Sequence, residues 1–196
     1  MRKSLPLLIL LVAVSAVAAS LSLQRLLSDA VKGERLAATR YDAFATQADT
    51  EGYAGVACLF RAQAKAERIH EARFIKLMTD RSMPVPTDAT PPVNVLSTQR
   101  NLEVAISAEQ AERDGTYLYA ISACNDCNDV AAAKVFDTTR DTETEHANLC
   151  ANALKTMSSM KNRQAFYVCP ICGYTTDVRL PFCPSCQRKE ALERVN

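Results

Sequence analysis

The chain has 196 residues, of which 48% are hydrophobic and 23% are charged, and its formal net charge is +1. This length suits one domain of ordinary size plus a small appendage, and the composition provides for a substantial core. Five glycines and no tryptophan argue against an all-β fold. A balanced charge gives no attraction for nucleic acid or for an anionic membrane surface, so we expect neither as a partner.

Residues 1–20 have the pattern of a secretory signal peptide. Two basic residues, Arg2 and Lys3, precede an apolar run from Leu5 to about Val17, and residues 16–18 fit an A-x-A cleavage site. The run is short for a helix that crosses a bilayer core of roughly 30 Å. We therefore expect cleavage, export to the periplasm, no stable membrane anchor afterwards, and a mature chain that begins near residue 21.

Four amphipathic helices are predicted over residues 21–160. Apolar residues recur at three- and four-residue steps over about 21–50, 53–79, 93–123 and 126–160. Between the second and third helices, four prolines lie within nine residues, which excludes a helix and predicts a long crossover loop. The pattern predicts an all-α four-helix bundle with one long crossover between helices 2 and 3.

The two histidines of the chain, His70 and His146, each follow a glutamate by three residues, Glu67 and Glu143 respectively. Positions i and i+3 share one face of a helix, so each pair can direct one carboxylate and one imidazole at a common point. A tyrosine also precedes each histidine by 29 residues. The sequence therefore reads as a duplicated helical hairpin that carries two halves of a metal site.

Further glutamates lie one helix length upstream of each pair. The two antiparallel helices of a hairpin bring residues separated by that length to the same level along the bundle. The predicted site comprises Glu34, Glu67, His70, Glu109, Glu112, Glu143 and His146. Buried carboxylates need compensating positive charge, and carboxylate and imidazole ligands without thiolate suit iron or manganese. Tyr41 and Tyr117, the two repeated tyrosines, are candidates either for hydrogen bonds to these carboxylates or for simple core packing.

Residues 161–196 differ in composition from the rest of the chain and carry two C-x-x-C motifs. These motifs, Cys169-Pro170-Ile171-Cys172 and Cys183-Pro184-Ser185-Cys186, are separated by ten residues. This arrangement surrounds a tetrahedral metal with four thiolates, and the spacing allows either zinc or iron. A segment of this size has almost no core, so we expect it to need its metal to fold.

The other four cysteines are Cys58, Cys124, Cys127 and Cys150. An even number is consistent with disulfides in an oxidising compartment. Cys124 and Cys127 are spaced so that they can form a disulfide across a helix junction or act as a redox couple. Buried, inert thiols are the alternative, and the sequence leaves these possibilities open.

The whole mature chain resembles the rubrerythrin family, in which a ferritin-like di-iron bundle is followed by a rubredoxin-like domain. Gly33-Glu34 with Tyr41 looks like the family's first helix, and the two Glu-x-x-His pairs fall on its ligand pairs. Glu109 and Glu112, with Tyr117 five residues on, resemble its third helix. Residues 167–174 resemble the rubredoxin metal-binding turn, which favours iron over zinc in the four-cysteine site.

This resemblance implies an oxidoreductase, a non-haem di-iron peroxidase that reduces hydrogen peroxide to water in oxidative-stress defence. Electrons would pass through the four-cysteine iron from a donor that the sequence does not identify. The resemblance also implies a head-to-tail homodimer, in which one subunit's tail approaches the other's bundle. It further implies that one iron exchanges His70 for Glu112 as the redox state changes.

Two other functions remain open from the sequence. One is a ferroxidase or iron-handling protein, and the other is a non-enzymatic module, either an electron carrier or a zinc-ribbon binding domain. The chain also departs from the family pattern. Gln187 stands where a glycine commonly follows the second C-x-x-C motif, the signal peptide is unusual in a mostly cytoplasmic family, and the four additional cysteines have no counterpart there.

Overall fold

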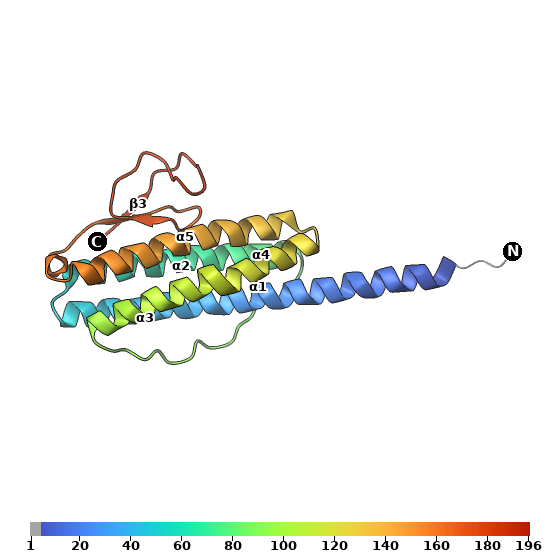
Figure 1. The fold of residues 1–196 in the computed structure, drawn as a ribbon, viewed down its shortest axis with the longest axis horizontal. Helices are drawn as coiled ribbons and strands as arrows, with labels where there is room; N and C mark the ends of the chain where they lie inside the picture. The colour runs from blue at the N-terminus through green and yellow to red at the C-terminus, as the bar shows by residue number, and fades with distance from the viewer. Residues whose placement is uncertain (1–4) are drawn as a thin grey trace.

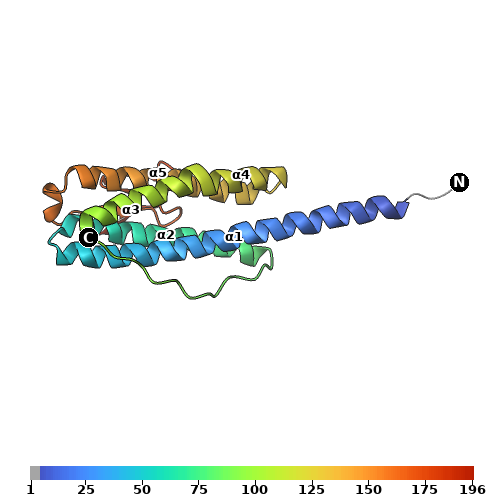
Figure 2. The same ribbon diagram turned by 60° about the horizontal axis from the view of Figure 1, so that its bottom comes forward.

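The computed structural model describes the backbone of residues 5–196 and the side chains from residue 22 onward. Its helices form an elongated antiparallel bundle, and a small sheet covers one side of it (Figures 1 and 2). The helices are α1 Leu5–Thr50, α2 Ala54–Asp80, α3 Thr98–Ala111, α4 Tyr117–Asp126 and α5 Val130–Lys155. A π-helical segment, η1 Glu112–Thr116, joins α3 to α4, and the three together form the third helix of the bundle. The predicted all-α four-helix bundle is confirmed.

Helix α1 continues well beyond the ends of the other helices (Figure 1). Its buried residues begin at Leu23 and Leu27 within the described side chains. No helix in the part searched, which excludes the undescribed residues, is long and apolar enough to cross a membrane. The predicted signal peptide, residues 1–20, lies outside the side chains that the structure describes, so its cleavage stays a prediction.

Two helix starts differ from the sequence prediction because polar caps fix them. The third helix begins at residue 98 rather than 93, where the Ser97 hydroxyl accepts a hydrogen bond from the Arg100 amide at 3.4 Å. The fourth begins at Val130 rather than 126, because the Asp129 carboxylate accepts from the Ala132 amide at 3.0 Å. Nothing in the apolar pattern predicted the π-helical segment within the third helix.

The predicted crossover loop is present between α2 and α3, and α1 holds it in place. The Arg35 guanidinium donates to the Pro86 carbonyl at 3.1 Å and to the Glu71 carboxylate at 2.8 Å. The Lys32 ammonium lies 2.6 Å from the Asp88 carboxylate. These contacts fix a proline-rich segment that cannot form a helix of its own.

Two hydrophobic clusters fill the bundle, and the predicted metal ligands lie between them along each helix. The first cluster includes Tyr41, whose ring stacks on Phe60 with centroids 5.8 Å apart. The second includes Tyr117, whose ring centroid lies 5.8 Å from that of Phe136. The repeated aromatic positions thus build equivalent layers on either side of one polar layer.

The four-cysteine domain contains a three-stranded antiparallel sheet with strand order β2-β1-β3. Its strands are β1 Phe166–Val168, β2 Thr175–Thr176 and β3 Glu193–Val195, with Val168 opposite Thr175. The predicted small four-cysteine domain after the bundle is therefore confirmed.

This domain lies against α2 and α5 of its own chain (Figure 1). An ion pair joins Lys65 of α2 to Glu193 of β3. The start of the tail segment approaches α2 closely at Gly55, because a Cβ added there would lie 2.7 Å from the Asn162 carbonyl oxygen. The family resemblance implied contact between this domain and a partner's bundle, whereas in the single chain it contacts its own. The homodimer itself stays a prediction.

Candidate metal centre

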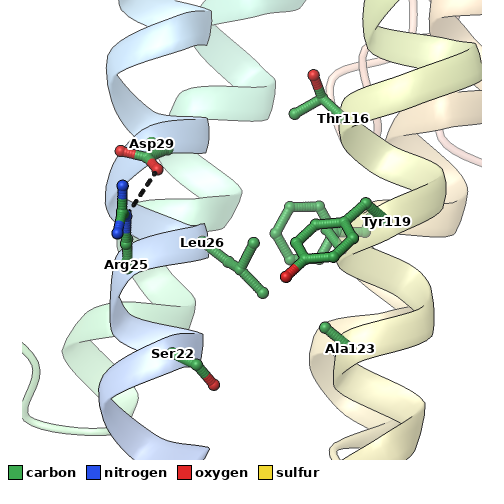
Figure 3. A pocket seen from close by; sticks show the side chains of 9 residues that line it. Ser22, Arg25, Leu26, Asp29, Thr116, Tyr119 and Ala123 are labelled. Atoms are coloured by element: carbon green, nitrogen blue, oxygen red, sulfur yellow. Dashed lines mark ion pairs between the residues drawn. The ribbon is translucent and has the colours of Figure 1, made fainter.

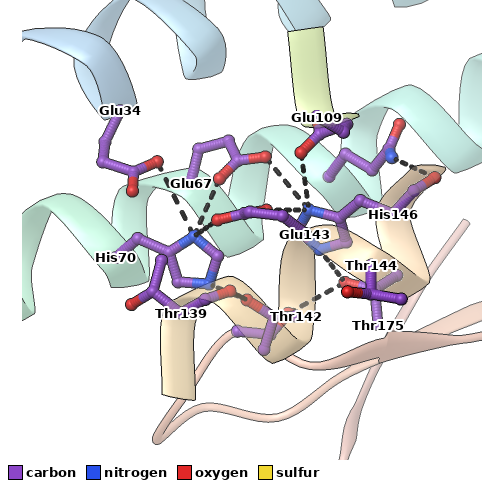
Figure 4. Close-up of polar contacts among 12 residues, drawn as sticks. Glu34, Glu67, His70, Glu109, Thr139, Thr142, Glu143, Thr144, His146 and Thr175 are labelled. Atoms are coloured by element: carbon purple, nitrogen blue, oxygen red, sulfur yellow. Dashed lines mark hydrogen bonds and ion pairs between the residues drawn. The ribbon is translucent and has the colours of Figure 1, made fainter. Parts of the chain in front are cut away.

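Six of the seven predicted bundle ligands converge on one buried layer (Figure 4). They form two groups of four, Glu34, Glu67, His70 and Glu143 in one and Glu67, Glu109, Glu143 and His146 in the other. Within each group, the ligand atoms all lie within 4.8 Å of one another. Glu67 and Glu143 belong to both groups, so their carboxylates lie between two neighbouring metal-binding positions.

The two histidines direct their Nδ1 atoms at these carboxylates. His70 Nδ1 lies 2.8 Å from Glu67 Oε2 and 3.1 Å from Glu143 Oε1. His146 Nδ1 lies 3.2 Å from Glu67 Oε1 and 2.9 Å from Glu143 Oε2. Each shared carboxylate therefore gives one oxygen to each histidine, the arrangement expected of a carboxylate that bridges two ions.

The opposite ring nitrogens contact acceptors. His70 Nε2 donates to the Cys172 carbonyl at 3.0 Å and to the Thr142 hydroxyl at 2.9 Å, and that hydroxyl donates in turn to the Thr139 carbonyl at 2.6 Å. His146 Nε2 lies 3.2 Å from the Thr175 hydroxyl. Proton donation through Nε2 leaves the Nδ1 lone pair available for a metal.

Glu112, the seventh predicted ligand, belongs to neither group. It is the first residue of the π-helical segment and is half-buried. Burial and the charges of Glu34 and Glu109 raise its pKa well above the ordinary value, so its carboxylate is close to the cluster. The structure thus has His70 within the cluster and Glu112 beside it, at a helix irregularity of the kind often found at functional sites.

The bundle cluster fits metal ions because its buried polar atoms lack partners. Nine buried side-chain nitrogen and oxygen atoms in the described residues have no hydrogen-bond partner, and six of them belong to this cluster. They are Glu34 Oε2, Glu67 Oε1, Glu109 Oε2, both Glu143 oxygens and His146 Nδ1. Several of these atoms contact one another as ion pairs but without hydrogen-bond geometry. Buried carboxylate oxygens without hydrogen bonds are costly in a folded protein, and bound cations remove that cost.

The metal-free cluster retains protons at neutral pH. Burial raises the pKa of Glu34 to about 8, and burial with the Glu67 charge raises the pKa of Glu109 well above its usual value. Burial acts on Glu67 in the same direction, but the nearby His146 and His70 rings outweigh it and lower its pKa. For both histidines, neighbouring carboxylates outweigh burial and raise the pKa.

Metal loading of the bundle is therefore expected to release protons and to strengthen as the pH rises from 6 to 8. Ligands must lose their protons to bind, and Glu34, with a pKa of about 8, holds its proton at pH 7, so we expect at least about one proton per chain, and the raised pKa of Glu109 acts in the same direction. Anaerobic ferrous-ion titration in a pH-stat, on protein whose four-cysteine site is already loaded, measures this release. Loading without proton release and with a pH-independent affinity would contradict it.

Both repeated tyrosines hydrogen bond to ligand carboxylates. The Tyr41 hydroxyl donates to Glu109 and the Tyr117 hydroxyl donates to Glu34, so each tyrosine contacts a carboxylate on another helix. Burial raises the pKa of both phenols well above the ordinary value, which keeps them protonated as donors. Of the two roles left open by the sequence, the contact with a ligand carboxylate is present alongside core packing.

The four cysteines of the tail also form one cluster. Their sulfur atoms all lie within 4.8 Å of one another, with Cys169 3.7 Å from Cys186 and Cys172 3.5 Å from Cys183. A hydrogen bond from Cys172, together with backbone amides, lowers the pKa of Cys169 to about 5, whereas the same contact and burial raise the pKa of Cys172. A tetrahedral metal ion would stabilise all four as thiolates.

The two cysteine turns have the same backbone geometry. The Gly173 amide donates to the Cys169 carbonyl at 3.0 Å, and the Gln187 amide donates to the Cys183 carbonyl at 2.9 Å. Both residues have positive φ, +83° at Gly173 and +57° at Gln187. Gln187 therefore adopts the left-handed conformation that a glycine would adopt without strain.

Replacing Gln187 with glycine is expected to stabilise the four-cysteine domain by about 0.5–1 kcal/mol. The substitution removes a left-handed penalty of about 1–2 kcal/mol, and the greater backbone entropy of glycine offsets part of the gain. The rate of metal release to a chelator measures the effect, with Gln187→Ala as the control. A faster release from the glycine variant would contradict the expectation.

None of the remaining cysteines, all of which lie in the described part of the chain, forms a disulfide. Burial raises the pKa of Cys150 to about 12 and that of Cys124 to about 11, as expected of inert thiols. Cys150 donates to the Gln63 side-chain oxygen at 3.2 Å. Cys127 is an exposed free thiol at the end of α4, so it is not one of the buried thiols that the sequence left open as an alternative.

A pocket of about 750 Å³ lies between α1 and α4, away from the metal ligands (Figure 3). Leu26, Tyr119 and Phe136 provide apolar surface, and an ion pair joins Arg25 to Asp29 at 3.8 Å. No predicted ligand lines this pocket. The metal layer is instead enclosed by side chains, since its six converging residues are at most 1% exposed.

Sequence reasoning missed the groups that hold the outer side of each histidine ring. Thr142, Thr175 and the Cys172 carbonyl contact the Nε2 atoms, and the Gln63 amide donates to the His146 carbonyl at 3.1 Å. Thr142 precedes Glu143 directly, so a search for hydroxyl residues near the ligands along α5 would have found it. No spacing rule relates a strand of the tail to a helix of the bundle.

Comparisons with known proteins agree with this architecture. A family model described as Rubrerythrin matches residues 25–154. Nigerythrin of Nitratidesulfovibrio vulgaris is 31% identical over 150 residues, which cover 76% of this chain and 73% of that protein. Rubrerythrin-2 of Clostridium acetobutylicum is 27% identical over 167 residues, which cover 84% of this chain and 91% of that protein. A solved structure of fully reduced, all-ferrous nigerythrin has a TM-score of 0.78 at 30% identity and covers 88% of this chain and 86% of that chain.

The fold and the site define a ferritin-like carboxylate bundle for two metal ions, joined to a rubredoxin-like four-cysteine domain. The chain belongs to the rubrerythrin family. It accordingly has a di-iron site of the rubrerythrin type and a separate four-cysteine metal site, as the sequence predicted. Like members of the rubrerythrin family in general, it is an oxidoreductase.

Proposed function

We propose that this protein is a non-haem di-iron peroxidase that reduces hydrogen peroxide to water in oxidative-stress defence. Each turnover takes up one peroxide, two electrons and two protons and yields two waters. The observation that carries the proposal is the hydrogen bond from His70 Nε2 to the Cys172 carbonyl at 3.0 Å. It joins a ligand of the bundle to a cysteine of the tail, and we propose that electrons pass between the two metal sites along this contact.

The proposed roles of the residues follow from their positions. Glu67 and Glu143 would contribute to holding both irons, Glu34 with His70 would complete one set of ligands, and Glu109 with His146 would complete the other. Iron bound there supplies the electron-transfer chemistry. Glu112 would supply a further carboxylate ligand in one redox state, and the buried hydroxyls of Tyr41 and Tyr117 donate hydrogen bonds to Glu109 and Glu34.

Burial of the site supports a small substrate. The converging ligands are at most 1% exposed, and the pocket described above does not include them, so a large organic substrate has no access. We propose iron in the four-cysteine site because electron delivery requires a metal that changes its redox state, which zinc does not. The electron donor is proposed to be a separate protein or small carrier that reduces this iron.

Metal analysis with a visible spectrum tests the proposal. Protein made with iron is expected to contain about three irons per chain, two in the bundle and one in the tail, and to show the colour of ferric thiolate. It is also expected to consume peroxide in the presence of a chemical reductant. A colourless protein with one tightly bound zinc and no bundle iron would favour the binding-module alternative and overturn the proposal.

We further propose that residues 1–20 are removed on export to the periplasm. The described core residues of α1 begin at Leu23, just after the predicted signal peptide. Sequencing the N-terminus of protein recovered from the periplasmic fraction is expected to give a start between residues 19 and 21 of the printed sequence. An N-terminus at residue 1, or protein confined to the cytoplasm, would contradict export.

A further inference from the structure

Thr175 is the residue of the four-cysteine domain that contacts His146 (Figure 4). It lies in β2, opposite Val168, and is fully buried. Its hydroxyl oxygen lies 3.2 Å from His146 Nε2 and 3.0 Å from the Gly173 carbonyl oxygen. A hydroxyl has a single proton, and a carbonyl can only accept, so Thr175 donates to Gly173 and accepts from His146.

This direction of donation determines the state of the His146 ring. The ring must carry a proton on Nε2, so Nδ1, which faces Glu143 at 2.9 Å and Glu67 at 3.2 Å, is the nitrogen that gives up its proton to bind a metal. An acceptor on the outer nitrogen also fixes the rotation of the ring and makes the inner nitrogen a stronger ligand.

The two histidines differ in what holds them. His70 Nε2 has two acceptors, the Cys172 carbonyl from the tail and the Thr142 hydroxyl from α5, so the bundle itself helps to fix that ring. His146 Nε2 has only the Thr175 hydroxyl among the described residues. The orientation of His146 therefore depends on a side chain that the four-cysteine domain supplies.

We propose that Thr175 is a positioning residue of the di-metal centre, whose hydroxyl fixes His146 as an Nδ1 ligand and thereby couples the four-cysteine domain to metal binding in the bundle. The domain then has a second role besides electron delivery, because its folded state strengthens the neighbouring metal site. This inference rests on His146 as a ligand, as proposed above, and not on peroxide as the substrate.

Three variants of the full-length protein test the inference. Thr175→Val keeps the shape and removes the acceptor, whereas Thr175→Ser keeps the hydroxyl. Thr176→Val is the matched control, because Thr176 is the adjacent buried residue of β2 and its hydroxyl accepts from the Val178 amide at 3.2 Å instead of from a histidine. Each protein, with its four-cysteine site already loaded, is titrated anaerobically with ferrous ion, and the dissociation constant of the bundle ions is measured.

Thr175→Val is expected to weaken ferrous binding in the bundle by about 10–100-fold, the loss typical when the outer partner of a metal-bound histidine is removed. Thr175→Ser and Thr176→Val are expected to bind nearly as tightly as the wild type. Equal losses in Thr175→Val and Thr176→Val would overturn the inference, since they would show an effect of strand packing. Equal losses in the valine and serine variants at residue 175 would overturn it as well, because retaining the hydroxyl would then give no protection.

The failure of the ligand assignment is distinguishable from the failure of this inference. His146→Ala is expected to lose bundle iron under the same titration. If His146→Ala binds ferrous ion as the wild type does, then His146 is not a ligand and both proposals fail. If His146→Ala loses binding while Thr175→Val retains it, the ligand assignment stands and the positioning role of Thr175 is overturned.

Discussion

Replacing Glu67 with alanine is expected to reduce the iron content from about three ions per chain to about one, leaving the tail site loaded. Glu67 gives Oε2 to the group around His70 and Oε1 to the group around His146, so one substitution damages both metal positions. Peroxide turnover is expected to fall by more than about 100-fold, since even an outer partner of a metal ligand contributes 10–100-fold. Iron analysis and steady-state peroxide consumption measure the two effects.

Two further variants make this result specific. Glu67→Gln keeps the size of the side chain and removes its charge, and it is expected to lose bundle iron as the alanine variant does. Glu145→Ala removes a half-buried glutamate next to His146 that belongs to neither ligand group, and it is expected to keep all its iron. An alanine variant at residue 67 that retains two bundle ions would contradict the bridging role.

Replacing Gly173 with alanine is expected to separate the tail from the bundle. A Cβ at this position would lie 2.3 Å from His70 Nε2 and 3.1 Å from the Ala66 carbonyl oxygen, and the φ of +83° disfavours any side chain by about 1–2 kcal/mol. The bundle is expected to stay folded, but turnover with an external donor should fall by about 10–100-fold because the contact between the Cys172 carbonyl and His70 is lost, which leaves only Thr142 on the outer nitrogen of that ring. Steady-state turnover and far-UV circular dichroism test the two expectations.

Comparison with Gln187 and Gly33 separates the effect of the positive φ from the effect of the contact with His70. Gln187 occupies the equivalent position of the second cysteine turn with a φ of +57° and carries a long side chain, so the left-handed conformation alone is tolerated there. The contact with His70 is what distinguishes Gly173. A Cβ added at Gly33 would have no neighbouring atom within 4 Å, so Gly33→Ala is expected to leave turnover unchanged. Normal turnover in Gly173→Ala would show that electrons do not follow the contact between the tail and His70.

The sequence predicted the metal layer well because that layer is encoded by helical spacing. A Glu and a His three residues apart share a helix face, and the equal Tyr-to-His spacing of 29 residues placed two such pairs in register. Glu34 and Glu109 follow from the length of the hairpin arms. The C-x-x-C pairs are likewise local, because each forms one turn of backbone. In both cases regular structure brings the residues together, helix faces and hairpin arms in the bundle and single backbone turns in the tail.

The contacts between the bundle and the tail could not be predicted in the same way. Thr175 meets His146 across 29 residues of chain, and Cys172 meets His70 across 102, with no periodicity that links them. The π-helical segment at Glu112 also leaves no mark on the apolar pattern, since it changes the hydrogen bonds of one turn and hardly alters which residues are buried. Tertiary packing decides all three features.

Single-turnover oxidation of the fully reduced protein tests the central claim most directly. Anaerobic protein with ferrous iron in both sites is mixed with hydrogen peroxide or with dioxygen in a stopped-flow instrument, and the colour of the four-cysteine iron is followed. We expect peroxide to react at least about tenfold faster than dioxygen, a difference of about 1.4 kcal/mol in the barrier, and the ferric thiolate colour to return in the same turnover. A faster reaction with dioxygen, or a four-cysteine iron that stays reduced while the bundle is oxidised, would contradict the account.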